Sequence, residues 1–275
     1  GPAFTGDTPH PENVIGSDER TRITGTGYMI FPYNTICYVT FTAGSYSYRG
    51  SGILVSPYTL LTAGHNVYEQ ETSTWSNNFL IAPYQYQASA GGAVSRPYGE
   101  KYATEIATNT PYQNSGDFEY DYGAAFIETP FASITTFMPI VFDYTNSGQV
   151  FNVNLLGYPA SVQGESSSQG LWYSTGNREG LSGIDNRLLL YTMDTTAGAS
   201  GSGVWNLATS NYRLVAIHNF GSTTSNGGAR FVSQNKTLVE SWLNWSPAST
   251  IPQLVSPADS ATMDNGRTDN QDYIE

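Results

Sequence analysis

Three residues of this 275-residue chain carry the side chains of nucleophilic catalysis: His65, Asp121 and Ser200. Ser200 lies in the turn Gly-Ala-Ser-Gly-Ser-Gly at 198–203, between two runs flanked by apolar residues. A turn of such small residues lets backbone N–H groups approach a ligand and face developing negative charge. The alternative is an ordinary Gly/Ser loop. The hypothesis of a nucleophile therefore depends on whether Ser200 has partners elsewhere in the chain.

The histidine and aspartate candidates each adjoin a strand-like run. His65 ends the run Thr-Leu-Leu-Thr-Ala-Gly-His at 59–65, and Asp121 directly precedes the apolar run at 122–127. The chain has only three histidines, and His65 and His218 both lie at predicted strand ends. The alternative interpretation is a surface histidine and a turn aspartate. A run that must be buried favours drawing Asp121 into a hydrogen-bonded interior position.

The chemistry of the three side chains is complementary. A serine hydroxyl is a poor nucleophile until a histidine accepts its proton, and a carboxylate fixes the histidine tautomer and stabilises the imidazolium. His65 and Asp121 belong to the first half of the chain and Ser200 to the second. We therefore expect the three residues to meet in a cleft between two halves.

The elements that must position these residues are predicted to be β-strands. The chain has 20 Tyr, 28 Gly and 14 Pro against only 11 Lys and Arg, a composition that favours strands and turns over helices. Apolar and β-branched runs at 35–44, 48–55 and 58–63 are separated by Gly, Pro and Ser, and six similar runs follow between 150 and 232. This spacing is typical of an all-β sandwich or barrel.

The predicted organisation has four parts. Residues 1–13, with three prolines and two glycines, form a leader outside the core; 14–130 form the first half, 131–245 the second, and 246–275 an acidic linker or tail. The apolar spacing of residues 235–243 predicts one amphipathic helix, expected to pack on the second half.

Composition also excludes several partners. The net charge of −12, without a cluster of Lys and Arg, argues against nucleic acid, and no run approaches 18 apolar residues, so no membrane span is expected. Cys37 is the only cysteine, so an internal disulfide is excluded. No ligand spacing of the EF-hand or zinc type occurs, and we expect neither a metal nor a cofactor. The Tyr-, Asn-, Ser- and Gly-rich composition is typical of exported bacterial proteins, and we expect a secreted monomer.

The segments around His65, Asp121 and Ser200 together resemble one known family. Thr-Ala-Gly-His, Tyr-Asp-Tyr-Gly-Ala-Ala-Phe-Ile-Glu and Gly-x-Ser-Gly-Ser are similar to the chymotrypsin-fold serine proteases, in particular the glutamyl endopeptidases of Gram-positive bacteria. The segments that begin at Val14 and surround His218 are also similar. The resemblance spans about residues 14–245. It implies two six-stranded Greek-key β-barrels with the three residues between them, serine endopeptidase activity, and secretion as a zymogen.

The resemblance implies a role for each matched residue. Ser200 would be the nucleophile, His65 the general base and then acid, and Asp121 the orienting carboxylate. The backbone N–H groups of Gly198 and Ser200 would form the oxyanion hole.

The resemblance further implies polypeptide substrates with acidic residues, cleaved after Glu and less readily after Asp. Thr195, His218 and the α-amino group of Val14 would bind the acidic side chain, because a carboxylate in a narrow site needs donors. Val14 has a free amine only after cleavage behind Asn13, so we expect that cleavage to activate the enzyme.

Two departures leave alternatives open. Gly203 stands where many relatives have proline, which is a small change in turn rigidity. Asp194 lies six residues before Ser200, where trypsin-like enzymes carry the aspartate that selects Lys or Arg. We expect Asp194 to be turned away or structural, with Lys/Arg specificity as the alternative. A non-catalytic surface or adhesion module is the other, suggested by the acidic tail and the Tyr-rich loops.

Overall fold

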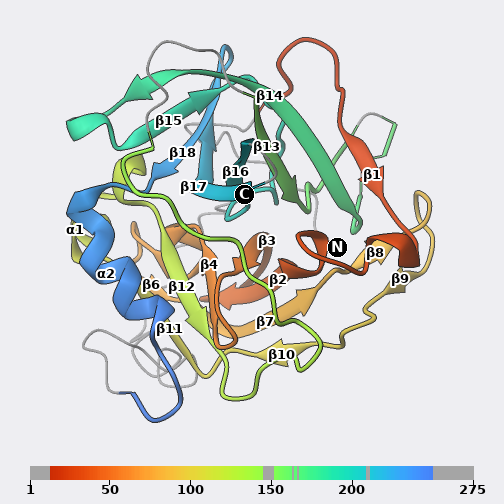
Figure 1. The fold of residues 1–275 in the computed structure, drawn as a ribbon, viewed down its shortest axis with the longest axis horizontal. Coiled ribbons are helices and arrows are strands. Elements are labelled where there is room, and N and C mark those ends of the chain that lie inside the picture. The colour runs from red at the N-terminus through yellow and green to blue at the C-terminus, as the bar shows by residue number, and fades with distance from the viewer. Residues whose placement is uncertain (1–12, 145–151, 163, 166, 209–210, 250–275) are drawn as a thin grey trace.

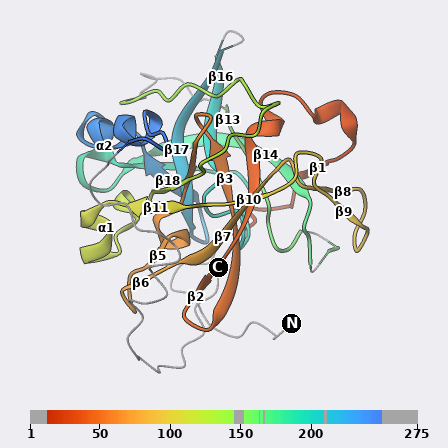
Figure 2. The ribbon, with the colours of Figure 1, turned by 90° about the horizontal axis from the view of Figure 1, so that it is seen from below.

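The computed structural model describes residues 13–144, 152–162, 164–165, 167–208 and 211–249. Its two large antiparallel sheets are each bent around a core, and they lie side by side in the molecule (Figure 1). Both helices lie on one side of the molecule, and the hairpin of β8 (Tyr86–Gln87) and β9 (Val94–Ser95) lies on the opposite side (Figures 1 and 2).

The first barrel has the strand order β10-β7-β2-β3-β4-β12-β11. Its two edge strands are consecutive parts of one bent segment, in which Ala103 N donates to Phe79 O and Thr104 N donates to Phe126 O, both at 2.8 Å. This segment therefore bridges β7 and β12 and closes the sheet. The strands are β2 (Ile36–Ala43), β3 (Tyr46–Leu54), β4 (Thr59–Thr62), β7 (Asn77–Pro83), β10 (Lys101–Tyr102), β11 (Glu105–Thr108) and β12 (Gly123–Phe126).

The second barrel has the order β14-β13-β16-β17-β18-β15 and closes through a direct pairing of β14 with β15. The short strand β1 (Thr21–Ile23) attaches outside this ring, on β14. The second sheet thus contains a closed ring of six strands, the first is bridged only by the bent segment of β10 and β11, and the predicted all-β chymotrypsin-like fold is confirmed. The strands are β13 (Asn152–Gly157), β14 (Leu171–Ser182), β15 (Leu188–Tyr191), β16 (Gly203–Ala208), β17 (Asn211–Gly221) and β18 (Asn226–Arg230).

The core formed by the described residues has three parts. One cluster fills the first barrel, with Val39 and Phe79 among its members, and another fills the second, with Val215 among its members. The largest cluster joins them, because it contains Ile53 of β3 and Leu214 of β17. The barrels therefore share a buried interface, and the candidate site residues are expected along it.

Two α-helices interrupt the β-structure of the described residues. The helix α1 (Thr110–Ser115) is not among the predicted elements, and it begins where the Asn109 side chain accepts a hydrogen bond from Tyr112 N. It ends at Gly116, whose φ of 70° is the left-handed conformation of a helix C-terminus. Two further hairpin strands are β5 (Tyr68–Glu69) and β6 (Thr74–Trp75).

The helix α2 (Ser233–Leu243) confirms the predicted C-terminal helix, but the expectation that it packs on the second half is wrong for its aromatic end. Thr59 Oγ1 donates to Trp242 O at 2.7 Å, and the Trp242 ring lies 6.0 Å from Tyr122. The Trp245 ring lies 5.0 Å from Phe126. The helix thus crosses from the second barrel onto the first. Neither helix in the described part of the chain is long and apolar enough to span a membrane.

Candidate active site

His65 and Asp121 leave adjacent strands of the first barrel. His65 belongs to the short 3-10 helix η3 (Gly64–Asn66) after β4, and Asp121 directly precedes Tyr122 and β12. Because β12 and β4 are paired, with Gly123 opposite Thr62, the two residues emerge side by side. His65 Nδ1 lies 2.6 Å from Asp121 Oδ2, and His65 N donates to Asp121 Oδ1 at 2.8 Å.

The Asp121 carboxylate is withdrawn from water, with its side chain 2 % exposed against 17 % for His65. A buried carboxylate is stable only when its oxygens are hydrogen-bonded, and both Asp121 oxygens accept bonds from His65. A carboxylate can only accept, so Nδ1 of His65 carries the proton. This fixes the histidine tautomer and turns Nε2 away from Asp121.

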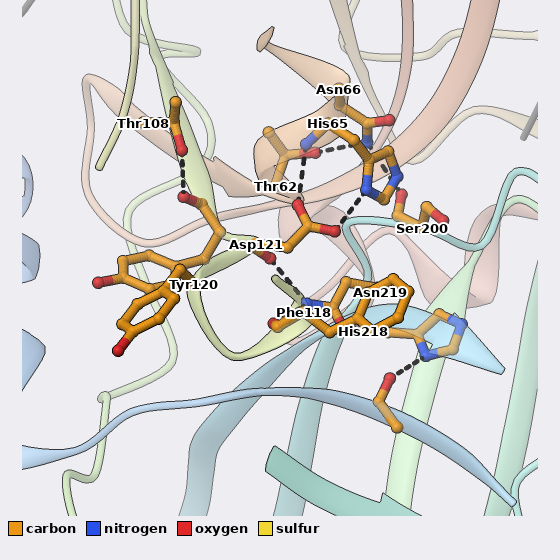
Figure 3. Close-up of polar contacts among 12 residues, drawn as sticks. Thr62, His65, Asn66, Thr108, Phe118, Tyr120, Asp121, Ser200, His218 and Asn219 are labelled. Carbon is orange, nitrogen blue, oxygen red and sulfur yellow. Dashed lines mark hydrogen bonds and ion pairs between the residues drawn. The ribbon is translucent and has the colours of Figure 1, made fainter. Parts of the chain in front are cut away.

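Ser200 completes the group predicted from the sequence. Figure 3 shows Ser200 beside the His65 ring, on the side away from Asp121. The Ser200 carbonyl accepts hydrogen bonds from Ser51 N at 2.8 Å and Asn66 Nδ2 at 3.1 Å. Ser51 and Asn66 both belong to the first barrel. The first barrel therefore holds the turn that contains Ser200 next to His65.

The glycines beside Ser200 have conformations that other residues rarely adopt. Gly198 and Gly201 have φ values of 93° and 89°. A Cβ on Gly201 would lie 2.1 Å from Ser51 O, and one on Gly198 would lie 2.7 Å from Tyr158 O. The Gly198 carbonyl accepts from Ser51 Oγ at 2.8 Å. Glycine is thus required at 201 by close contact with Ser51 of the first barrel, and at 198 by close contact with Tyr158 of the second half of the chain.

Asn219 is a site residue that the sequence did not reveal. Its Nδ2 donates to Asp121 O at 2.9 Å and to Phe118 O at 2.8 Å (Figure 3). Asn219 lies on β17 of the second barrel, so it fixes the aspartate of the first barrel from the opposite side. The only sequence signal is its position directly after His218.

His218 and Thr195 are both buried. His218 lies within β17, which continues to Gly221, and not at a strand end as predicted. Its Nδ1 is 2.6 Å from Tyr191 Oη and 2.9 Å from Gly227 O. The Thr195 hydroxyl has no hydrogen-bond partner among the residues that the structure describes.

Asp194 is bound to the N-terminal segment. Its oxygens accept hydrogen bonds from Ile15 N at 2.8 Å and Glu19 N at 2.9 Å, and the residue is buried. Arg20 adds a further anchor by donating to Thr196 Oγ1 at 2.8 Å. The Asp194 carboxylate is therefore engaged by backbone, which agrees with a structural role for this residue.

The predicted cleavage point, between Asn13 and Val14, lies against Thr195 and Asn226 of the second barrel. Asn13 O accepts from Thr195 N at 3.2 Å and from Asn226 Nδ2 at 2.6 Å, and Asn13 N donates to Asn226 Oδ1 at 3.1 Å. Val14 thus stands between two anchored residues, Asn13 and Ile15. Asn226 is a second residue that the sequence did not single out. Within the described ranges, no group of three or more His, Cys, Asp or Glu side chains could hold a metal ion.

Fold and site define a chymotrypsin-like serine protease. Residues 50–217 match the trypsin-like peptidase domain family, and the chain belongs to that family. The predicted serine endopeptidase activity is confirmed at this level.

Individual relatives are more specific. The chain is 28% identical over 242 residues to a glutamyl endopeptidase of Bacillus licheniformis, covering 85% of this chain and 70% of the relative. It is 28% identical over 240 residues to a Bacillus subtilis protein named an extracellular metalloprotease, covering 86% and 72%.

Solved structures agree. A Glu endopeptidase in complex with MPD is 25% identical, with a TM-score of 0.69 over 84% of this chain and 100% of that one. The protease Anisep from Arthrobacter nicotinovorans, 19% identical with a TM-score of 0.65 over 78% and 98%, shows the same fold. The predicted resemblance is confirmed: the chain is a homologue of glutamyl endopeptidases.

Proposed function

We propose that the protein is a secreted, monomeric serine endopeptidase that cleaves peptide bonds after Glu, and less readily after Asp, through an acyl-enzyme. The observation that carries this proposal is the His65 ring, fixed on one side by Asp121 and flanked on the other by Ser200. Secretion is supported by the name of the Bacillus subtilis relative, which is called extracellular.

The reaction follows from these positions. His65 Nε2 takes the proton of Ser200 Oγ as the oxygen attacks the scissile carbonyl carbon, and the imidazolium then protonates the leaving amine as the C–N bond breaks. Water attacks the acyl-enzyme by the same route in reverse. Asp121 stabilises the imidazolium. The N–H groups of Gly198 and Ser200 stabilise the oxyanion, at about 3 kcal/mol per donor.

Specificity for an acidic side chain is supported by two features of the second barrel. The Thr195 hydroxyl is a buried donor with no partner among the described residues. His218 is buried, and its ring is oriented by the contacts of Nδ1 with Tyr191 Oη and Gly227 O. A histidine N–H and a hydroxyl can both donate hydrogen bonds to a carboxylate. The Asp194 carboxylate is already engaged by Ile15 N and Glu19 N, so it is not offered to a substrate Lys or Arg.

Activation by cleavage after Asn13 is supported by the position of this residue against Thr195. Cleavage there gives Val14 an α-ammonium group next to the position that Asn13 occupies beside Thr195. Its positive charge favours the binding of a substrate carboxylate. The zymogen is then the chain in which Asn13 remains attached.

A panel of peptides with Glu, Asp, Gln, Lys or Phe at the cleaved position tests specificity. We expect the highest kcat/KM for Glu, and a preference for Lys would overturn the proposal.

Ser200→Ala is expected to abolish cleavage and to leave the unfolding transition in place. If the protein were a non-catalytic binding module, this substitution would abolish no activity. A form that begins at Val14 is compared with one that retains residues 1–13, and equal rates of the two would contradict activation.

A further inference from the structure

Asn226 is the first residue of β18, the strand that pairs with β17 on one side and with β15 on the other. It is completely buried and pairs with Tyr191 of β15. The next residue, Gly227, provides the carbonyl that His218 Nδ1 contacts. Asn226 therefore belongs to the same surface as the residues proposed to bind the acidic side chain, although no motif marks it.

The hydrogen bonds of the Asn226 amide are fully accounted for. Nδ2 donates to Met193 O at 2.7 Å and to Asn13 O at 2.6 Å, and Oδ1 accepts from Asn13 N at 3.1 Å. Both carbonyl partners can only accept, so the amide orientation is fixed by its neighbours. One side-chain N–H is thus used within the barrel, and the other N–H and the oxygen are used by the N-terminal segment.

The Asn13 carbonyl oxygen occupies two donors at once. It accepts from Asn226 Nδ2 and also from Thr195 N, at 3.2 Å. Thr195 carries the buried hydroxyl that lacks a partner in the described chain. The Asn13 carbonyl oxygen therefore accepts hydrogen bonds from Asn226 Nδ2 and Thr195 N, and Thr195 also carries a hydroxyl donor. An oxygen of a bound carboxylate could accept from the same groups.

We propose that Asn226 is a specificity-determining residue whose Nδ2, with Thr195 N, binds the carboxylate of the substrate's acidic side chain. In the unprocessed chain the Asn13 carbonyl blocks both donors. The proposal rests on the proposed Glu specificity and on cleavage after Asn13. Once Asn13 leaves, Nδ2 and Thr195 N each have a hydrogen to offer, and Oδ1 of Asn226 is left to accept from the new Val14 ammonium.

An amide suits this position better than any charged side chain. Its oxygen meets the ammonium while its N–H meets the carboxylate, so one residue orients both partners without a net charge. A carboxylate at position 226 would instead repel the carboxylate of the substrate. The test therefore compares a charge change with a simple loss of the amide.

The experiment uses the form that begins at Val14, with Asn226→Asp and Asn226→Ser. The kcat/KM values are measured on a peptide pair that differs only in Glu or Gln at the cleaved position, and a serine-reactive phosphonate titrates the active enzyme. We expect the Glu/Gln ratio to fall about 10-fold in Asn226→Ser and about 100-fold in Asn226→Asp, as loss of a charge-assisted bond and added repulsion predict. The Gln rate should change less than about 3-fold.

The matched control is Asn206→Asp, because Asn206 is also a buried asparagine of the second barrel and its Nδ2 donates to Asn152 O at 2.9 Å. Its Glu/Gln ratio should equal that of the parent. An unchanged ratio in both Asn226 variants overturns the inference, and so does the absence of titratable enzyme in both, which would make Asn226 structural. If the parent itself shows no preference for Glu over Gln, the proposed function fails instead.

Discussion

The residues proposed to perform the reaction and those proposed to select the substrate are held in different ways. The backbone of Ser200 and the backbone of Asp121 are each bonded by the opposite barrel, whereas His65 is held by Asp121 of its own barrel. The Ser200 carbonyl of the second barrel is bonded by Ser51 N and Asn66 Nδ2 of the first, and the Asp121 carbonyl of the first is bonded by Asn219 of the second. The chemistry therefore depends on the interface of the two barrels.

The residues proposed to select the substrate come from the second barrel and from the N-terminal segment, residues 13–20. Thr195 and Asn226 are bonded to Asn13, and Asp194 is bonded to Ile15 and Glu19. A short piece of chain thus completes this region. The comparison indicates that rate and selectivity can be changed independently: substitutions at the interface should alter kcat, and substitutions near the N-terminal segment should alter selectivity.

The largest effect is expected for Asp121→Asn. An amide in place of the carboxylate favours the wrong tautomer of His65, and kcat should fall about 10⁴-fold with the Glu/Gln ratio unchanged. Steady-state kinetics on the peptide pair measure both quantities. Asp117→Asn, at an exposed aspartate nearby, is the control and should keep full activity. A loss of less than tenfold in Asp121→Asn would contradict the assigned role.

A smaller loss is expected for Ser51→Ala, which removes a side chain that donates to Gly198 O and accepts from Tyr158 N. Two buried backbone groups of the second barrel then lack a partner, at a cost of about 1–3 kcal/mol in the free energy of unfolding. Since Gly198 is a candidate oxyanion donor, kcat should fall about tenfold. Denaturant unfolding and kinetics are compared with Ser47→Ala, at an exposed serine of the same strand. Unaltered kcat would show that the barrels do not hold the turn.

Asp194→Asn tests the other region. The amide keeps an acceptor for Ile15 N or Glu19 N but loses the charge, so kcat/KM for Glu should fall about three- to tenfold with no gain of Lys cleavage. The substrate panel measures this. If the parent cleaves after Lys and the variant does not, Asp194 selects the substrate, and the division between the two regions disappears.

The smallest effect concerns Asp143, which accepts from the first N–H and the hydroxyl of Ser233 in α2. These bonds lower the pKa of Asp143 below its usual value. Its stabilisation is therefore present at neutral pH and is lost as the pH falls through the lowered pKa. Because Asp143 is exposed, Asp143→Ala should cost less than about 1 kcal/mol at neutral pH. The difference in unfolding free energy should shrink in acid, as the pH falls through this lowered pKa, and a constant difference would exclude the ionised form as its source.

Local patterns predicted the strands, and they singled out His65, Asp121 and Ser200, which the fold brings together (Figure 3), because each lies beside an apolar run. The pattern of 235–243 identified the buried face of a helix, but it carries no information on which barrel covers that face. The helix α1 was missed because it is only six residues long and its signals, Asn109 and Pro111 at the start and Gly116 at the end, enclose no helical apolar pattern.

The residues that hold the site were less predictable. Asn226 meets Asn13 across 213 residues of sequence, and a single asparagine in a Gly-rich strand has no spacing that would reveal such a contact. Ser51 and Asn219 are similar cases. Ser51 and Asn219 matter because they bond backbone groups of the opposite barrel that would otherwise lack a partner, and only folding brings those groups near them.

The path of α2 has a consequence for how the molecule unfolds. The helix continues from the last strand of the second barrel, yet Trp242 and Trp245 contact Tyr122 and Phe126 of the first. Neither barrel can melt by itself without exposing these two indoles or leaving the other with an open apolar surface. The protein should therefore denature as one cooperative unit, and tryptophan fluorescence should report the moment at which the barrels separate.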